Sequence, residues 1–199
     1  YGPASLAKDS TWLPAHMDRT QRMYERSKNH PAIVIWSLGN EAGNGINFER
    51  TYDWMKSVEK SRPVQYERAE QNYNTDIYCR SVEELMAYAR QTEPKVYRPF
   101  IMTEYLHTMG NSGGGLKEYM HVFETEPIVQ GGCIWDWVDQ SFREIDKDGK
   151  WYWSYGGDYG PKDVPSFGNF CCNGLVNAAR EPHPHLIEVK KEYQYIKSA

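Results

Sequence analysis

The sequence predicts an α/β fold with parallel strands, and three observations support this prediction. The first is the apolar run at residues 33–38, which is rich in β-branched side chains and suits a strand buried on both faces. The second is the alternation of helix-like and strand-like segments along the chain. The third is that several strand-like segments end in polar residues and glycine, as strands do at the catalytic face of a (β/α)8 barrel.

Helices are predicted where apolar residues recur at helical spacing, at residues 10–27, 47–62, 81–88, 116–123 and 185–196. Asp9 or Ser10 can cap the first helix, and Pro14 is tolerated in its first turn. The third helix opens with Ser-Val-Glu-Glu at 81–84, which has the form of a capping box. Pro31 and Pro63 follow the first and second helices and mark their ends.

Strands are predicted at residues 33–38, 64–67, 76–79, 100–104 and 131–137. We therefore expect a (β/α)8 TIM barrel that is incomplete here, with this chain supplying roughly its C-terminal five strands and their helices. The single predicted domain, residues 1–199, is the C-terminal part of that barrel. Residues 142–177 lack periodicity and are rich in Gly, Trp and Tyr, so we expect a long irregular loop after the last strand.

The composition is that of a globular protein, with 199 residues of which 40% are hydrophobic and 25% charged. A formal net charge of -4 argues against nucleic acid or a membrane surface as a partner. The 4 cysteines include no C-x-x-C pair, so neither a zinc site nor a disulfide framework is indicated. Free thiols favour the cytoplasm. The chain begins as if inside a loop, so a signal peptide could precede it, and a periplasmic or secreted protein stays possible.

Two carboxylates stand at corresponding places on two predicted strands. Glu41 and Glu104 each follow an apolar run and precede a loop rich in Gly and Asn. Glycoside hydrolysis needs two such groups, one to protonate the leaving oxygen and one to attack the anomeric carbon or to activate water. The alternative is that each glutamate is an ordinary ion-paired surface residue.

The sequence motifs around these glutamates resemble those of the central catalytic domain in the β-galactosidases of glycoside hydrolase family 2. Three of these motifs are Ser-Leu-Gly-Asn-Glu at 37–41, Thr-Glu-Tyr-Leu-His-Thr-Met-Gly-Asn-Ser at 103–112 and Gly-Gly-Cys-Ile-Trp-Asp-Trp-Val-Asp-Gln at 131–140. The segments Asn-Phe-Cys-Cys-Asn-Gly-Leu-Val at 169–176 and Arg-Glu-Pro-His-Pro at 180–184 also look like that family's. The resemblance spans nearly the whole chain, in order, and it implies a TIM-barrel retaining β-galactosidase.

The resemblance implies a role for each candidate site residue. Glu41 would be the general acid/base and Glu104 the nucleophile that forms the galactosyl-enzyme. Asn40 would hydrogen-bond the sugar 2-hydroxyl, a contact that strengthens in the transition state. His107 would contact sugar hydroxyls, and Trp135 would form an apolar wall for the galactose ring. Without the motif, a structural histidine and a tryptophan of the core are the ordinary interpretations of these two residues.

The resemblance also implies two cations. Glu41 would be one ligand of Mg²⁺, whose other ligands in the family precede the first residue of this chain. The main-chain carbonyl of Phe170 and the side chain of Asn173 would be ligands of Na⁺ near the galactose 6-hydroxyl. The partner would be a β-galactoside substrate, and the full-length enzyme would be a homo-oligomer.

The chain departs from the family pattern after Cys79. The family usually has a Met-Tyr pair there, whose tyrosine hydrogen-bonds the nucleophile, but here Cys79 and Arg80 run directly into Ser81. Neither Tyr78 nor Tyr105 sits at the matching position. Because strands of the barrel are missing, we expect the chain by itself to be nearly inactive and prone to self-association.

Two other functions stay open. One is a different specificity within the family, such as β-glucuronidase or β-mannosidase, although His107, Trp135 and the segment at 170–173 favour galactose. The other is a carbohydrate-binding fragment without turnover, in which the glutamates only hold hydroxyls. The natural galactoside, lactose or a larger one, is not specified by the sequence.

Overall fold

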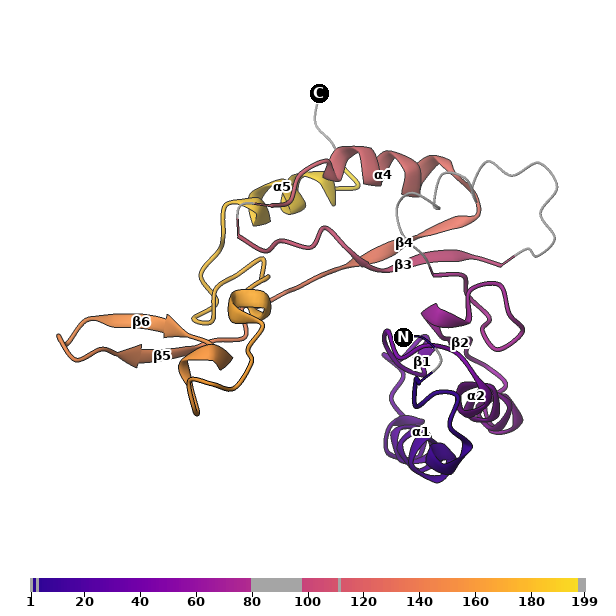
Figure 1. Ribbon diagram of the computed structural model, residues 1–199. Coiled ribbons are helices and arrows are strands. Elements are labelled where there is room, and N and C mark those ends of the chain that lie inside the picture. The colour runs from indigo at the N-terminus through magenta and orange to yellow at the C-terminus, as the bar shows by residue number, and fades with distance from the viewer. Residues whose placement is uncertain (1, 3, 80–97, 111, 197–199) are drawn as a thin grey trace. The chain divides into compact units, whose positions relative to one another are not determined.

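The computed structural model describes residues 2, 4–79, 98–110 and 112–196 (Figure 1). The chain divides into two compact units. The first comprises Tyr1–Thr103 with Glu126–Gly131, and the second comprises Glu104–Thr125 with Gly132–Ala199. The helix predicted at 81–88 lies outside the described residues.

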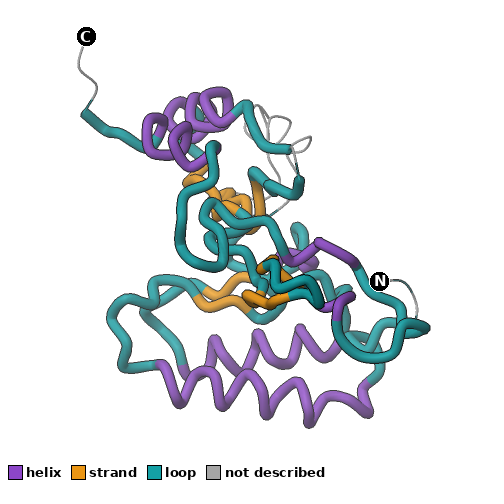
Figure 2. Tube along the Cα trace, turned by 90° about the vertical axis from the view of Figure 1, so that its left-hand side faces the viewer, coloured by secondary structure: helices purple, strands orange, loops and turns teal. Residues whose placement is uncertain are grey.

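The first unit packs two helices against a short pair of strands. A 3-10 turn, η1 (Ser10–Trp12), leads into α1 (Leu13–Ser27), and α2 (Ile46–Val58) lies beside it (Figure 2). The strands β1 (Trp36–Ser37) and β2 (Val64–Gln65) pair in parallel. Trp36, Tyr52, Met55 and Val64 form the buried cluster between these layers, and the apolar stripes of both helices face it. The predicted helices over 10–27 and 47–62 are confirmed, although α2 ends four residues early.

The start of the first helix follows the predicted local chemistry. The side chain of Asp9 accepts a hydrogen bond from the backbone N–H of Thr11, at 3.0 Å, and so caps η1. Pro14 lies in the first turn of α1, where its missing N–H leaves no hydrogen bond unmade.

The first predicted strand is much shorter than expected. The run at 33–38 is reduced to Trp36–Ser37, and Val34 is 68% exposed, so the prediction of a long strand buried on both faces is wrong. Its partner β2 is equally short because it begins immediately after Pro63, which has no N–H to add to the ladder. The strand predicted at 76–79 is likewise reduced to one parallel bridge, between Tyr78 and Phe100.

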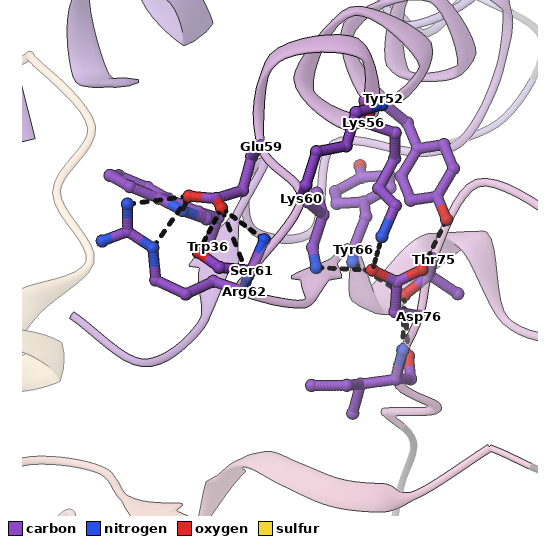
Figure 3. Close-up of polar contacts among 12 residues, drawn as sticks. Trp36, Tyr52, Lys56, Glu59, Lys60, Ser61, Arg62, Tyr66, Thr75 and Asp76 are labelled. Atoms are coloured by element: carbon purple, nitrogen blue, oxygen red, sulfur yellow. Dashed lines mark hydrogen bonds and ion pairs between the residues drawn. The ribbon is translucent and has the colours of Figure 1, made fainter. Parts of the chain in front are cut away.

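A buried glutamate ties the end of α2 to β1 (Figure 3). Glu59 is 3% exposed and accepts hydrogen bonds from Trp36 Nε1 at 3.0 Å and from Arg62 Nε at 2.8 Å. Ser61 adds its backbone N–H and its hydroxyl. Burial acts to raise the pKa of Glu59, but the hydrogen bonds from Ser61, Trp36 and Arg62 outweigh it and lower this pKa to about 2.

A second carboxylate, that of Asp76, connects β2 to the side chains of Tyr52 and Lys56 on α2 (Figure 3). It accepts hydrogen bonds from the hydroxyl of Tyr52 at 2.6 Å, from Lys56 Nζ at 2.7 Å and from the backbone N–H of Val64 at 2.8 Å. Burial acts to raise the pKa of Asp76, whereas the hydrogen bonds from Lys56, Tyr52 and Val64 lower it below its ordinary value. Glu59 and Asp76 thus hold β1 and β2 in place, and β1 leads to the predicted site residues Asn40 and Glu41.

The strands β3 (Phe100–Tyr105) and β4 (Val129–Ile134) form a second pair. Phe100 N donates to Ile128 O, and Trp135 N donates to Tyr105 O. These bonds advance along both strands in the same sense, so the pair is parallel. The strand predicted at 100–104 is confirmed, whereas the one predicted at 131–137 begins and ends earlier than expected.

The second unit contains α4 (Leu116–Thr125), α5 (His185–Glu192) and a β-hairpin. The hairpin pairs β5 (Phe142–Ile145) with β6 (Trp151–Ser154) in antiparallel register. The prediction of an irregular segment from 142 onward is therefore wrong in its first part. The missed signal is Asp-Lys-Asp-Gly between two strand-like runs, where the carboxylate of Asp146 accepts from the N–H groups of Asp148 and Lys150 to close the turn.

Three separate two-stranded pairs account for the strands within the described residues, so a closed barrel is not seen there. The final helix stops at Glu192 and does not reach 196 as expected. Of the helices that the structure describes, none has both the length and the apolar character needed to span a bilayer.

Candidate functional site

The predicted site residues fall into two groups, one in each unit. Asn40 and Glu41 lie in the first unit. The second unit holds the other five, Glu104, His107, Trp135, Phe170 and Asn173. The structure brings members of each group together, and the pairing of Glu41 with Glu104 stays a prediction.

Glu41 lies on an exposed loop that follows β1. Its φ angle is +50°, a left-handed conformation that is uncommon for a residue with a side chain. Its backbone N–H donates to Glu67 Oε1, and its carboxylate oxygen Oε1 lies 3.0 Å from Arg68 Nη2. Glu67 and Arg68 belong to η2 (Glu67–Ala69), which follows β2 directly. The carboxyl ends of two neighbouring parallel strands therefore bring these residues together, as in parallel α/β proteins generally.

Glycines allow this loop to pack closely on the helix beside it. A Cβ added to Gly39 would lie 3.3 Å from the Phe48 ring, which itself stacks on Tyr66 with 3.8 Å between ring centroids. The hydroxyl of Tyr66 donates to Gly43 O at 2.5 Å. The aromatic pair thus fixes the loop on either side of Glu41. Next to it lies a cavity of about 400 Å³, lined mostly by polar and charged side chains: Lys8, Asn44, Arg68, Glu70 and Asn72.

Glu104 and His107 lie together at the end of β3. Glu104 Oε1 is 3.7 Å from His107 Nε2, which is within ion-pair reach but too long for a hydrogen bond. The Glu104 side chain is 37% exposed and that of His107 is 28% exposed. The imidazole also lies against the Phe170 ring, with 5.5 Å between the ring centroids. A carboxylate, an imidazole and an aromatic face therefore adjoin on one accessible surface.

Backbone hydrogen bonds connect this surface to Trp135 and Asn173. Thr108 N donates to Trp135 O at 3.3 Å, and the Thr108 hydroxyl donates to Asn173 O at 2.7 Å. Asp136 N donates to the same carbonyl at 2.9 Å. Trp135 keeps 37% of its surface exposed, so it is not a fully buried core residue. Thr108 thus links the backbone at Trp135 to the backbone at Asn173, next to His107 in the chain.

The side chain of Asn173 is buried and only half satisfied. Its Nδ2 donates to the carbonyl oxygen of Phe170. Its Oδ1 is buried without a hydrogen-bond partner among the described residues. A carbonyl oxygen and an amide oxygen are the donors that hard cations such as Na⁺ prefer, and a buried orphan acceptor is costly unless something binds it. Phe170 and Asn173 therefore fit a sodium site.

The surroundings of Glu41 do not fit a magnesium site in the same way. Within the part of the chain that the structure describes, no three His, Cys, Asp or Glu side chains gather in a group that could hold a metal ion. The one predicted ligand, Glu41, has a guanidinium at its carboxylate.

Sequence reasoning missed the residues that hold Asn173 in place. Asp139 Oδ1 accepts from the N–H of Gly174 at 2.8 Å, and Asp139 Oδ2 lies 2.8 Å from His183 Nε2. His185 Nε2 lies 2.9 Å from Gly174 O, with the two imidazoles stacked at 5.6 Å. A signal was present, since Asp139 lies in the family motif at 131–140 and His183 in the one at 180–184. Only the fold shows that these two residues, which are 44 positions apart in the sequence, are in contact.

Replacing Gly174 with Ala is expected to destabilise the second unit by about 3 kcal/mol, the upper end of the usual cost of overpacking. The new Cβ would lie 2.3 Å from the backbone atoms Asp139 N and Val176 O, which cannot move aside as a flexible side chain can. Urea unfolding of the full-length protein measures the change. Gly156→Ala is the matched control, because its Cβ meets nothing within 4 Å and should change stability by less than about 0.5 kcal/mol. Equal stability of the two variants would show that the packing argument is wrong.

Comparison with known proteins places these observations in a family. The family model described as glycosyl hydrolases family 2, TIM barrel domain, matches residues 3–198. Two proteins of Enterobacter cloacae, β-galactosidase and β-galactosidase 2, are each 44% identical to the chain over 209 aligned residues. The alignment covers 96% of this chain and 20% of each relative, so the chain spans about a fifth of their length.

Solved structures show the same fold. The β-glucuronidase of Ruminococcus gnavus matches 92% of this chain and 36% of its own, with a TM-score of 0.59 at 20% identity. The family 2 β-galacturonidase of Eisenbergiella tayi matches 91% of this chain and 37% of its own, with a TM-score of 0.56 at 17% identity. At these identities the likeness concerns the fold alone. Together with the family match, it confirms the predicted TIM-barrel fold class.

Proposed function

The chain belongs to the glycosyl hydrolases of family 2, and from that premise we propose that the protein carrying it is a retaining β-galactosidase. The main support for a galactoside as the substrate is the 44% identity to the two Enterobacter β-galactosidases over 96% of the chain. The likeness to the enzymes that act on uronic acids is only 17–20% identical and extends to the fold. Terminal β-D-galactosyl residues are therefore the proposed substrate class.

The proposed mechanism is a double displacement by two glutamates. The Glu104 carboxylate attacks the anomeric carbon while Glu41 gives its proton to the glycosidic oxygen, and the bond between that oxygen and the anomeric carbon breaks. The sugar is then held as an ester of Glu104. Glu41, now ionised, takes a proton from water, whose oxygen attacks the same carbon and releases Glu104. This mechanism requires the two carboxyl groups to be ~5–5.5 Å apart in the assembled protein.

The neighbouring residues are proposed to hold the galactose ring. His107 lies beside Glu104 and has its side chain partly exposed, which suits contact with sugar hydroxyls. The exposed part of Trp135 suits the apolar face of the ring. Asn40, next to the acid in the chain, is the proposed partner of the 2-hydroxyl, a contact that contributes most in the transition state.

Sodium is proposed at Phe170 O and Asn173 Oδ1, where its charge would fix the sugar 6-hydroxyl. The buried, unsatisfied Oδ1 of Asn173 supports this proposal. Magnesium at Glu41 is proposed only with ligands from outside the described residues, and no step of the mechanism depends on it.

A panel of aryl glycosides tests the proposed specificity on the full-length protein. We expect kcat/KM for the β-galactoside to exceed that for the β-glucuronide and the β-mannoside by roughly 10²-fold or more, because polar sites reject sugars whose hydroxyls or charges they cannot match. A preference for the glucuronide or the mannoside would assign another specificity of the family. Binding of galactose without turnover of any glycoside would favour the non-catalytic alternative.

A further inference from the structure

Three residues of the first unit form a closed ring at the proposed acid. Glu41 N–H donates to Glu67 Oε1, Glu67 Oε2 lies 3.1 Å from Arg68 Nε, and Arg68 Nη2 lies 3.0 Å from Glu41 Oε1. The guanidinium thus lies within ion-pair distance of two carboxylates, through two different nitrogens. The Glu67 side chain is 12% exposed and that of Arg68 is 33% exposed, whereas the Glu41 side chain is 52% exposed, so solvent partly screens the pair of Arg68 with Glu41.

The ring also explains how the loop keeps a disfavoured conformation. Glu41 has a left-handed φ of +50°, which persists only where surrounding contacts hold it. Glu67 holds its backbone and Arg68 holds its carboxylate. The positive charge beside the Glu41 carboxylate is therefore the guanidinium of Arg68, a side chain of the same unit.

We propose that Arg68 is the permanent counter-charge of Glu41 and that it opposes the binding of Mg²⁺ to that carboxylate. A divalent cation on Glu41 would share the carboxylate with the guanidinium, and the two positive charges would repel each other. Lys8 and Glu70, which line the adjoining cavity, carry opposite charges and add little net field. The inference rests on the proposed function, because it takes Glu41 as the acid/base and as a candidate magnesium ligand.

Isothermal titration of the full-length protein with MgCl₂ tests the proposal. Arg68→Gln should bind Mg²⁺ roughly tenfold more tightly than the unmodified protein, which is the effect expected when charges of +1 and +2 about 5 Å apart are screened by water. Arg68→Met, which keeps an aliphatic side chain but removes the charge, should bind Mg²⁺ as tightly as Arg68→Gln. Arg68→Lys keeps the charge and should stay within about twofold of the unmodified protein.

Arg50→Gln is the matched control for a change of net charge in the same unit. Its guanidinium is 60% exposed and lies 4.0 Å from Asp53, so its removal should leave Mg²⁺ affinity unchanged. The proposal is overturned if Arg68→Gln and Arg68→Met bind Mg²⁺ no more tightly than the unmodified protein, if no variant binds it, or if Arg50→Gln shows the same gain.

Hydrolysis of an aryl β-galactoside by the same samples separates this inference from the proposed function. Tighter Mg²⁺ binding in a protein that hydrolyses no galactoside would refute the function and leave the role of Arg68 standing. Normal hydrolysis with unchanged Mg²⁺ affinity in both charge-removing variants would refute the role of Arg68 alone.

Discussion

Replacing Glu104 with Gln is expected to lower kcat on an aryl β-galactoside by roughly 10⁴-fold or more in the full-length protein, because an amide cannot attack the anomeric carbon. The change keeps the size and shape of a side chain that is 37% exposed at the end of β3, so folding should be preserved. Galactose should therefore still bind. Steady-state kinetics together with equilibrium binding of galactose measures both effects.

Glu41→Gln is the companion variant, and its effect should depend on the leaving group. A poor leaving group needs a proton from the acid, so its rate should fall by roughly 10²–10⁴-fold. An activated nitrophenolate needs none, so its first step should be nearly normal. If Glu104→Gln retained activity, or if the loss in Glu41→Gln were equal for all leaving groups, the assigned roles would be wrong.

Glu59→Ala is expected to destabilise the first unit by about 3 kcal/mol, the lower end of the cost of breaking a buried ion pair. The change would leave the guanidinium of Arg62 and the indole N–H of Trp36 without the acceptor that they share. Arg62 also stacks over the Trp36 ring, 4.8 Å from its centroid, so the loss would spread to the packing of β1. Urea unfolding of the full-length protein measures the change.

The contribution of Glu59 should also depend on pH. Its folded-state pKa, about 2, lies below the ordinary value of 4.5. The stabilisation is therefore complete above pH 4.5 and is lost as the pH falls from 4.5 through about 2. The difference in unfolding free energy between the unmodified protein and Glu59→Ala should shrink over that interval.

Glu25→Ala serves as the control for Glu59→Ala. Its carboxylate is 59% exposed and pairs with Lys28 on the surface of α1, so the variant should lose less than about 0.5 kcal/mol. A loss in Glu59→Ala as small as in this control would mean that the buried network contributes little to stability.

The sequence by itself determined the helices and the class of the fold. The places of α1, α2 and α4 follow from apolar spacing, and Pro14 suits the start of α1, because helical periodicity and the missing N–H of proline act within a few residues; the end of α2 at Val58 lies short of the end expected before Pro63. The sequence also singled out Glu41 and Glu104 as candidate catalytic residues, since each follows a strand-like run, and the motifs around them indicated the family to which the chain belongs.

Only the tertiary structure decided which residues meet. The strand expected at 33–38 is cut to two residues because its partner β2 begins only after Pro63 and is just as short. Arg68 reaches Glu41 across 27 residues, and His183 reaches Asp139 across 44. Such contacts depend on how the elements pack, and spacing along the chain carries no signal for them. The charges around the proposed acid were therefore beyond prediction from the sequence, and the motifs that contain Asp139 and His183 did not show that these two residues meet.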